Sequence, residues 1–174
     1  FMLENEVSVL HVTPTQYSYF IKTGRQIESL RYLCIGAEKL SHDLVRRSYR
    51  SVKPGCRVFN MYGPTEATII SATLEVTPDY DEKYNHSGSI PIGYAAGNSA
   101  HYILDNHMNP VPVNVVGELY ISGDGLAAGY INKPELTAQK FVQPNSKFIN
   151  QHSKLYKTGD MARWLEDGTI EFLG

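Results

Sequence analysis

The chain has 174 residues, a formal net charge of −2, 42% apolar residues and 20% charged residues. This composition is ordinary for a soluble globular protein, and its charge gives no basic field for a nucleic acid or an anionic membrane surface, so we expect neither partner. No apolar run approaches the roughly 20 residues of a membrane span. Cys34 and Cys56 have no Cys-x-x-Cys spacing, which favours buried free thiols in a reducing, cytoplasmic compartment.

The first part of the chain alternates apolar runs with amphipathic segments. The pattern predicts strands over 7–12, 30–35 and 58–61, and helices over 16–22 and 40–49. Thr13 and Pro14 offer an N-cap and a first helical residue for the first helix. Strands and helices that alternate with short links are typical of a parallel sheet with crossover helices. Gly36 and Gly63 follow two of these strands, so we expect their loops to line one rim of the sheet.

The third predicted strand leads into Gly63-Pro64, followed directly by Thr65 and Glu66. Glycine can take a positive φ and proline fixes the next φ, so the strand ends in a forced turn. In α/β proteins the crevice outside the carboxyl ends of the strands binds ligands, which makes this hydroxyl and carboxylate candidates for chemistry. The alternative interpretation is a surface turn with a solvated glutamate, because such turns commonly separate secondary-structure elements.

After residue 70 the pattern changes to the alternation of short strands. It predicts strands over 71–76, 100–105, 116–122, 154–157, 161–166 and 169–172, with a hairpin at Asp167-Gly168. Residues 78–85 are predicted to form a charged loop, and the one helix of this half should begin near Pro134, with Leu136, Phe141 and Val142 facing the core. We therefore expect an incomplete α/β portion over residues 1–76 and a β-rich, mostly antiparallel portion over residues 77–174.

Three runs of residues resemble consecutive core motifs of the adenylation domains of nonribosomal peptide synthetases, which are adenylate-forming (ANL) enzymes. They are Asn60-Met61-Tyr62-Gly63-Pro64-Thr65-Glu66-Ala67-Thr68, the run 117–141 that begins with Gly117-Glu118-Leu119, and the run 155–164 that contains Tyr156-Lys157-Thr158-Gly159-Asp160. Their order and spacing agree with the family over essentially the whole chain. The resemblance implies part of an ANL-type N-terminal core, in which a parallel α/β layer is followed by a distorted antiparallel β-barrel subdomain.

This resemblance also implies a reaction. ATP would activate the carboxylate of an amino acid, giving an aminoacyl adenylate and pyrophosphate, and the aminoacyl group would pass to the thiol of a carrier protein's phosphopantetheine arm. The implied cofactors are ATP and Mg²⁺. The implied partners are the amino-acid substrate, the carrier protein, the rest of the adenylation domain and neighbouring synthetase modules, all in the cytoplasm.

Residue roles follow from the same resemblance. Thr65 would contact the α-phosphate and Glu66 would bind Mg²⁺, a cation that prefers hard carboxylate oxygens. Asp160 would hold the ribose hydroxyls, a role suited to an acceptor-only carboxylate. Phe172 stands where relatives often have a tyrosine near the nucleotide. The implied adenine site is formed by Gly36, Ala37, Glu38, Asn60 and Tyr62, whose ring offers a π-face.

The resemblance further implies an amino-acid pocket. Its specificity-setting positions would be His11, Cys34, Gly36, Met61, Ile69 and Ile70. None of them is a carboxylate or a lysine, and burying a charged substrate side chain without a partner is costly, so we predict a neutral substrate side chain. The alternative interpretation is that some of these residues, Ile69 first, belong to the ordinary core.

The chain also departs from the family pattern. We find neither the Gly/Ser/Thr-rich loop that ends in lysine and holds the β- and γ-phosphates, nor the mobile C-terminal lid subdomain with its catalytic lysine. We therefore expect a central fragment that is inactive alone and that exposes an unpaired sheet edge. Two alternatives remain: a catalytically silent adenylation-like scaffold or interaction piece, and a free-standing β-rich binding domain, which requires the first sixty residues to be irrelevant.

Overall fold

The computed structural model describes residues 4–85, 87–144 and 154–174. The described residues form two sheets, one with the strand order β1-β2-β3-β4-β5 and one with the order β10-β9-β7-β6, in which β8 also pairs with β9. The chain divides into two compact units. Unit 1 comprises Phe1–Met61 and Leu74–Ile92, and unit 2 comprises Tyr62–Thr73 and Gly93–Gly174.

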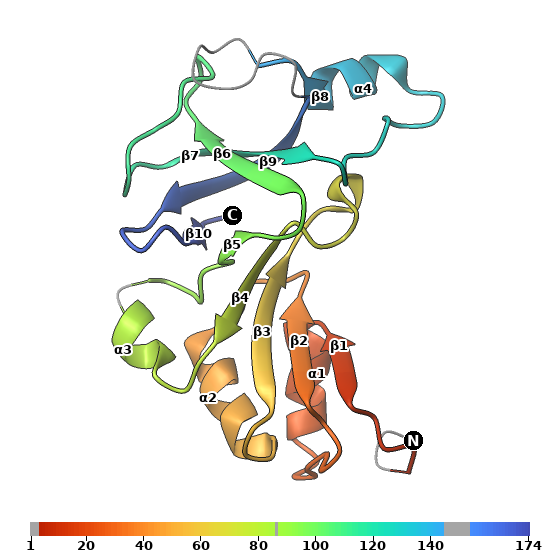
Figure 1. Cartoon of the computed structure of the whole chain (residues 1–174), viewed down its shortest axis with the longest axis vertical. Coiled ribbons are helices and arrows are strands. Elements are labelled where there is room, and N and C mark those ends of the chain that lie inside the picture. Colours follow the sequence, from red (N-terminus) through yellow and green to blue (C-terminus); the bar gives the residue numbers. More distant parts are fainter. Residues whose placement is uncertain (1–3, 86, 145–153) are drawn as a thin grey trace. The chain divides into compact units, whose positions relative to one another are not determined.

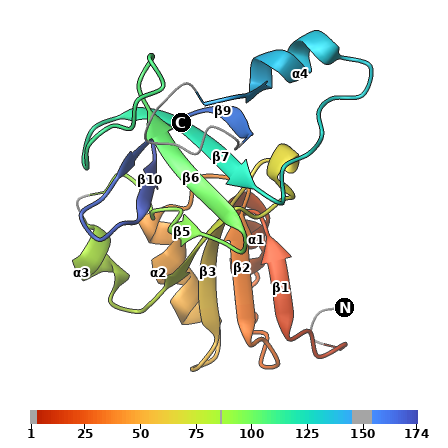
Figure 2. The same cartoon turned by 45° about the horizontal axis from the view of Figure 1, so that its top comes forward.

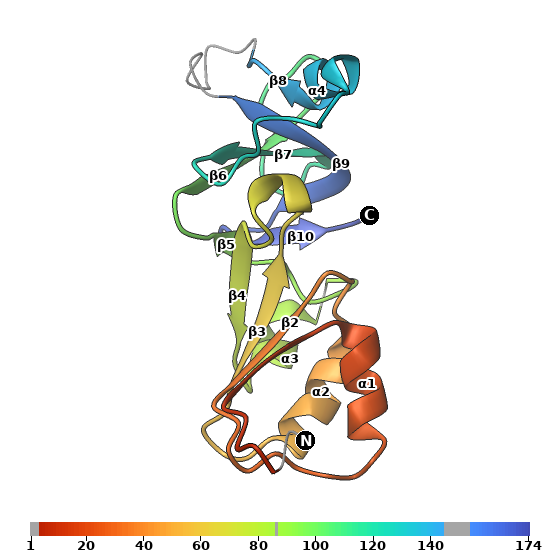
Figure 3. The same ribbon diagram turned by 90° about the vertical axis from the view of Figure 1, so that its right-hand side faces the viewer.

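Unit 1 is built on parallel strands. β1 (Val9–Val12) pairs with β2 (Tyr32–Gly36), and β2 pairs with β3 (Arg57–Tyr62), both in parallel. The helices α1 (Pro14–Ile21) and α2 (His42–Ser51) lie together on one side of these strands (Figure 3). Leu33, Ile35 and Val58 are completely buried, so the apolar runs of the sequence form the core of a parallel α/β layer, as predicted.

The two helices of unit 1 begin at polar caps. The hydroxyl of Thr13 accepts a hydrogen bond from the backbone N–H of Gln16 at 3.2 Å, and the side-chain oxygen of Gln16 accepts one from the backbone N–H of Thr13 at 3.1 Å. This reciprocal capping box, with Pro14 as the first helical residue, satisfies orphan donors at the start of α1. The hydroxyl of Ser41 caps α2 with a single hydrogen bond, which it accepts from the backbone N–H of Leu44 at 3.2 Å. The predicted helix start at Thr13-Pro14 is confirmed.

β1 lies at the end of the first sheet. Among the described strands it pairs with β2 alone, and its first residue, Val9, is 57% exposed. An edge strand with unpaired backbone groups can pair with another chain. The structure therefore contains the exposed sheet edge that the sequence analysis predicts.

Unit 2 is antiparallel (Figures 1 and 2). Its strands after residue 93 are β5 (Tyr94–Ala95), β6 (Ser99–Leu104), β7 (Gly117–Gly123), β8 (Phe141–Val142), β9 (Leu155–Trp164) and β10 (Ile170–Phe172). The helix α4 (Pro134–Lys140) precedes β8. Leu104, Tyr120 and Leu155 form a buried cluster between strands. The predicted fold class, a parallel α/β layer followed by an antiparallel β region, is confirmed.

Several elements differ from those predicted from the sequence. Residues 78–85 are not a loop throughout, because they contain the helix α3 (Tyr80–Tyr84). Its charged residues suggested a solvated segment, but Tyr80 and Tyr84, one turn apart, are both buried. For the same reason α4 is not the one helix of the second half. β4 (Ala72–Val76) was predicted nearly to the residue, whereas the two-residue strand β5 was missed.

Two further corrections concern β8 and β9. The strands predicted over 154–157 and 161–166 are one strand, β9, which continues through Gly159. A register shift between Glu118 and Tyr120 on the neighbouring strand β7 marks an irregularity there, and Gly159 takes a φ of 88° that other residues rarely adopt. Phe141 and Val142 belong to β8, because α4 ends at Lys140. No helix in the described part of the chain combines the length and the apolar content that crossing a membrane requires.

Candidate functional site

Four of the six predicted pocket residues lie on one face of the parallel strands in unit 1. His11 is the register partner of Cys34, and Gly36 is the register partner of Met61. Cys34 and Gly36 are two residues apart on β2, so their side-chain positions point to the same face. A Cβ atom added to Gly36 would lie 2.7 Å from the backbone oxygen of Met61. Only glycine allows the two strands to approach this closely here.

The loop after β2 holds the next candidates, Ala37 and Glu38. Ala37 adopts a φ of 68°. The carboxylate of Glu38 accepts hydrogen bonds from the hydroxyl of Thr15 at 2.6 Å and from its backbone N–H at 3.2 Å. These bonds from Thr15 lower the pKa of Glu38. Glu38 therefore ties the loop to the first turn of α1.

Asn60, on β3, is 2% exposed. Its side-chain amide donates to the backbone oxygens of Ile90 at 3.2 Å and Pro91 at 2.8 Å. Both acceptors lie in unit 1. Asn60 therefore fixes the segment around residues 90 and 91 against β3.

In unit 2 the turn at Gly63-Pro64 leads into the short 3-10 helix η1 (Thr65–Ala67). Gly63 does not have a positive φ. Glycine is required there because the Cβ of any other residue would clash with the backbone oxygen of Ile69, at a distance of 2.4 Å. The positive φ values fall instead on Thr68, at 56°, and Ile69, at 71°. Left-handed backbone at β-branched residues is strained, and such strain clusters at functional sites.

Glu66 is half-buried and its carboxylate is held by a tyrosine. The phenol of Tyr130 donates to Oε1 of Glu66 at 2.5 Å. Partial burial acts to raise the pKa of Glu66, but hydrogen bonding, first of all from Tyr130, and the positive charge of Lys140 outweigh burial, so the pKa lies below its usual value. The neighbouring Thr65 is exposed, and its hydroxyl has no hydrogen bond to any described residue.

Tyr62, Asp160 and Phe172 come together in unit 2 although they are far apart in sequence. The phenol of Tyr62 donates a short hydrogen bond to Oδ2 of Asp160, and the ring of Tyr62 lies 5.8 Å, centroid to centroid, from the ring of Phe172. Burial, and then the hydrogen bond to Asp160, raise the pKa of Tyr62. The hydroxyl of Thr158 accepts from the backbone N–H of Asp160 at 3.0 Å and donates to Leu119. β9 thus presents Asp160 beside an aromatic pair.

The hydrogen bond that Tyr130 makes with Glu66 was not predicted from the sequence. Tyr130 lies in a run that carries the resemblance, but it was not assigned a role. Tyr130 is 64 residues from Glu66, and nothing in its local pattern indicates the acceptor. Of the remaining pocket candidates, Ile69 belongs to the strained turn of unit 2 and Ile70 follows it directly; Ile69 is 64% exposed. An ordinary core role for Ile69 is therefore wrong.

The residues around Glu66 fit one kind of metal site. No group of three or more histidine, cysteine, aspartate or glutamate side chains in described positions could hold a metal ion. Mg²⁺, however, is commonly bound by one or two carboxylates together with substrate phosphates and water. A single accessible carboxylate at Glu66 fits a magnesium ion that arrives with a nucleotide, and does not fit a metal held by protein ligands alone.

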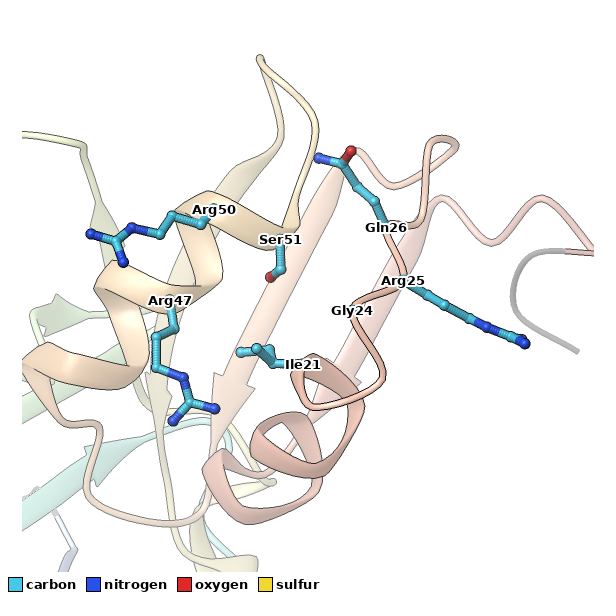
Figure 4. A pocket seen from close by; sticks show the side chains of 7 residues that line it. All are labelled: Ile21, Gly24, Arg25, Gln26, Arg47, Arg50 and Ser51. Atoms are coloured by element: carbon cyan, nitrogen blue, oxygen red, sulfur yellow. The ribbon is translucent and has the colours of Figure 1, made fainter.

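A cavity of about 280 Å³ lies elsewhere in unit 1 (Figure 4). Arg25, Arg47 and Arg50 line it, but Figure 4 shows their guanidinium groups extending in different directions. Arg47 also lies 3.5 Å from the carboxylate of Asp43. The three arginines therefore do not converge on a common anion position. The other residues that line the cavity are Ile21, Gly24, Gln26 and Ser51.

Comparison with known proteins gives matches over nearly the whole chain. Residues 1–131 match the family model described as AMP-binding enzyme. The chain is 38% identical to tyrocidine synthase 3 of Brevibacillus parabrevis over 171 residues, which is 98% of this chain and 2% of that protein. It is 38% identical to bacitracin synthase 1 of Bacillus licheniformis over 98% of this chain and 3% of that protein. The chain thus spans only a few per cent of these relatives.

Solved structures give the same result. The chain superposes with a TM-score of 0.86 and 30% identity on holo-PA1221, a nonribosomal peptide synthetase protein that contains adenylation and PCP domains, over 98% of this chain and 29% of that one. It superposes equally well on the AMPPNP-bound form of FmoA3, a nonribosomal peptide synthetase, with 30% identity over 99% of this chain and 18% of that one.

Proposed function

Because the chain belongs to the family of AMP-binding enzymes, we propose that it forms the central part of a domain that activates an amino acid with ATP. The observation that carries this proposal is the meeting of Tyr62, Asp160 and Phe172 in unit 2. An aromatic pair beside a carboxylate offers a stacking face and an acceptor for hydroxyls, which are the features that a nucleoside needs.

The nucleotide contacts are proposed residue by residue. Oδ2 of Asp160 accepts from Tyr62, and a carboxylate has further lone pairs that can accept from ribose hydroxyls. Thr65, whose hydroxyl is exposed, would donate to the α-phosphate. Gly36, Ala37, Glu38 and Asn60, in unit 1, are the further proposed adenine contacts. Glu38 and Asn60 hold the loop and strand that carry them.

Magnesium and the reacting groups are proposed to meet at Glu66. A bound Mg²⁺ would offset the charge on the phosphates as pyrophosphate leaves. Glu66 would supply one carboxylate oxygen to it, and its lowered pKa keeps that oxygen ionised. Thr65 would orient the α-phosphate for attack by the amino acid's carboxylate, and orientation of this kind supplies a large part of the barrier reduction.

The amino-acid side chain is proposed to be neutral. His11, Cys34, Gly36 and Met61 share one face of the parallel strands, which supports a common pocket wall. Ile69 and Ile70 are the further proposed pocket positions, and none of the six residues is a carboxylate or a lysine. The proposed functional division places the α/β portion in residues 1–76 and the β-rich portion in residues 77–174.

The proposed partners follow from the reaction. The product would be transferred to the thiol of a carrier protein, and one structural relative contains adenylation and PCP domains in a single protein. Neighbouring synthetase modules and the other parts of the adenylation domain would act with this chain in the cytoplasm. Adenylation by this chain alone is expected to stay at background, because the groups that hold the β- and γ-phosphates are not found in its sequence.

The test is nucleotide binding by the purified chain, measured by NMR titration with AMP and with ATP and Mg²⁺. We expect weak, saturable binding that Asp160→Asn weakens about tenfold, the loss of one good hydrogen-bonding group to a ligand. Asp43→Asn, the same change at an exposed position of α2, is the matched control and should leave binding unchanged. Equal affinity in Asp160→Asn and the unsubstituted chain would contradict the proposed site, and no binding by a folded chain would favour the silent scaffold.

A further inference from the structure

We propose that Tyr130 is a positioning residue for Glu66, and that the contacts of the segment 123–130 fix the position of Tyr130. The phenol would fix the Glu66 carboxylate in one orientation and leave its remaining lone pairs directed at a cation. The metal role of Glu66 rests on the proposed function, whereas the contact between Tyr130 and Glu66 is observed in the structure and is independent of that function.

The contact itself is direct. The phenol oxygen of Tyr130 lies 2.5 Å from Oε1 of Glu66, which is the range of a short, charge-assisted hydrogen bond. A carboxylate can accept about four hydrogen bonds. Tyr130 uses one of these sites, so a cation can still bind. A phenol on a rigid ring fixes direction better than water would, because it cannot move independently of the chain.

Tyr130 is itself held from behind by α4. The hydroxyl of Thr137 accepts a hydrogen bond from the backbone N–H of Tyr130 at 2.9 Å and donates to the backbone oxygen of Lys133 at 2.9 Å. A Cβ atom added to Gly129 would lie 2.4 Å from Cγ2 of Thr137. Gly129, with a φ of 154°, therefore allows the chain to approach α4 closely enough for the Thr137 bond to form.

The segment before Tyr130 is fastened to η1. The backbone N–H of Ala127 donates to the backbone oxygen of Glu66 at 2.8 Å, and the hydroxyl of Thr68 donates to the backbone oxygen of Gly125 at 2.6 Å. In Figure 1 the coil between β7 and α4 passes directly beside the yellow turn that follows β3. Glu66 and Thr68 are thus joined to the segment directly before Tyr130, which restricts the distance between the side chains of Glu66 and Tyr130.

Lys154 also stabilises the segment 123–130. Its ammonium group donates to the backbone oxygens of Ala128 at 2.7 Å and Ala127 at 3.3 Å, and it lies 4.4 Å from the ring centroid of Phe141. The ring of Phe141 packs edge-on against Tyr130 at 5.8 Å. One cation therefore holds the carbonyl groups before Tyr130 and the ring beneath it.

The protonation states agree with this geometry. Burial, and then the hydrogen bond to Glu66, raise the pKa of Tyr130, so the phenol remains a donor. The pKa of Glu66 is lowered despite its burial, so the carboxylate remains an acceptor. The proton therefore stays on Tyr130 while the negative charge stays on Glu66.

The first experiment reads the contact without any ligand. In the ¹³C-labelled chain at pH 7, the carboxyl resonance of Glu66 is assigned by its loss in Glu66→Gln. Tyr130→Phe keeps the ring and removes only the hydroxyl, and we expect it to shift this resonance by more than a line width. Tyr120→Phe is the matched control, because the phenol of Tyr120 donates to a different carboxylate, that of Glu118. It should leave the resonance in place.

The second experiment reads the consequence for a cation. Mn²⁺ added with ATP should broaden the Glu66 carboxyl resonance, and Tyr130→Phe should raise the apparent Kd for Mn²⁺ about tenfold, which is typical when a residue that orients a metal ligand is removed. Lys154→Met should act in the same direction with a smaller effect. Lys157→Met, the same change three residues further along the chain, on β9, is its control and should have none.

The outcomes separate the two proposals. If Tyr130→Phe leaves the carboxyl resonance where Tyr120→Phe leaves it, Tyr130 does not hold Glu66 and the inference is wrong. A shifted resonance with an unchanged Kd for Mn²⁺ also overturns it, because the contact would then not position the carboxylate for a cation. If Mn²⁺ causes no broadening in the unsubstituted chain, the metal role of Glu66 fails, and the resonance shift alone decides whether Tyr130 holds Glu66.

Discussion

Unit 1 and unit 2 position their candidate residues by different means. In unit 1 the candidates sit on parallel strands and the loop after them, and strand register alone brings His11 beside Cys34 and Gly36 beside Met61. In unit 2 side chains meet across long separations, 98 residues for Tyr62 and Asp160. The two units also differ in the ionisable side chains that they bury. Among described residues, buried histidine and carboxylate side chains occur only in unit 2, at His101 and Glu171.

Because of this difference, we expect the stability of the two units to respond differently to the same perturbation. An apolar parallel layer loses stability when volume is removed, at any pH. A unit with buried ionisable groups also loses stability when those groups must change charge. Trp164, the single tryptophan of the sequence, lies in unit 2, whereas α1 and α2 lie in unit 1. Tryptophan fluorescence and the helical circular dichroism signal therefore report mainly on different units.

The largest effect is expected from Leu33→Ala in unit 1. Leu33 is completely buried, and truncating such a leucine costs about 4 kcal/mol through lost burial and the cavity left behind. Urea unfolding followed by circular dichroism should show the same loss at pH 7 and pH 5. Leu173→Ala, at a residue that is 37% exposed, is the control and should change stability by about 0.5 kcal/mol or less. A loss at Leu33 that depends strongly on pH would break the comparison.

The next effect is the response of unit 2 to acid. His101 is 7% exposed, its Nδ1 has no hydrogen-bond partner in the described structure, and burial lowers its pKa to about 4. The unfolded chain therefore binds the proton first, so stability is fully present above pH 6.5 and is lost as pH falls towards 4. From this pKa difference the loss is about 3 kcal/mol. Urea unfolding followed by Trp164 fluorescence should show it.

Two variants check the origin of this acid response. His101→Gln should flatten the pH dependence, whereas His107→Gln, at an exposed histidine, should leave it intact. If His101→Gln does not fold, NMR titration of the unsubstituted chain replaces it. A His101 ring that titrates near pH 6.5 in the folded chain would show that the prediction is wrong.

A smaller effect is expected at the strained turn after η1. Ile69 has a φ of 71° although it is β-branched, and asparagine tolerates this backbone region better. Ile69→Asn should therefore raise the free energy of unfolding by about 1 kcal/mol. Ile131→Asn makes the same change at a residue that is 89% exposed and lacks a positive φ, so it should be neutral. Thermal unfolding of both variants measures the difference, and equal effects would mean that the turn carries no strain.

The smallest effect is expected where the geometry looks strongest, at the ion pair of Arg57 and Glu75 in unit 1. The guanidinium donates to both carboxylate oxygens, at 2.8 Å and 2.5 Å, but the two side chains are 51% and 38% exposed. Exposed pairs typically contribute about 0.5 kcal/mol. A double-mutant cycle with Arg57→Gln and Glu75→Gln should give a coupling energy of this size that decreases with salt. A much larger coupling energy would show that an ion pair contributes strongly to the stability of unit 1, which would weaken the comparison between the two units.

Local signals in the sequence were enough for much of the fold. Thr13, Pro14 and Gln16 are close together in sequence, so the start of α1 could be predicted from their capping chemistry. The resemblance to adenylation domains of nonribosomal peptide synthetases is confirmed by the comparisons. α3 was missed because its charged residues concealed the burial of Tyr80 and Tyr84, which only tertiary contacts decide.

The candidate site shows the same limit. Thr65 and Glu66 could be singled out because a Gly-Pro turn precedes them. The phenol that contacts Glu66 could not, because Tyr130 becomes its neighbour only through Gly129, Thr137 and the segment fastened to η1. The assigned roles of these residues stay predictions until binding is measured.

The order in which the chain visits the two units has a consequence for dissecting the protein. The backbone changes units three times, at residues 61/62, 73/74 and 92/93. A split at residue 92 would leave Tyr62 and Glu66 on the first piece and Asp160 and Tyr130 on the second. Neither piece would contain a whole unit 2, so separate expression should give two incomplete polypeptides, and mixing them should restore the Tyr62–Asp160 and Glu66–Tyr130 contacts only when the pieces reassociate. The same interleaving makes the chain a candidate for a split reporter, in which assembly of two halves is detected through the restored Glu66–Tyr130 contact.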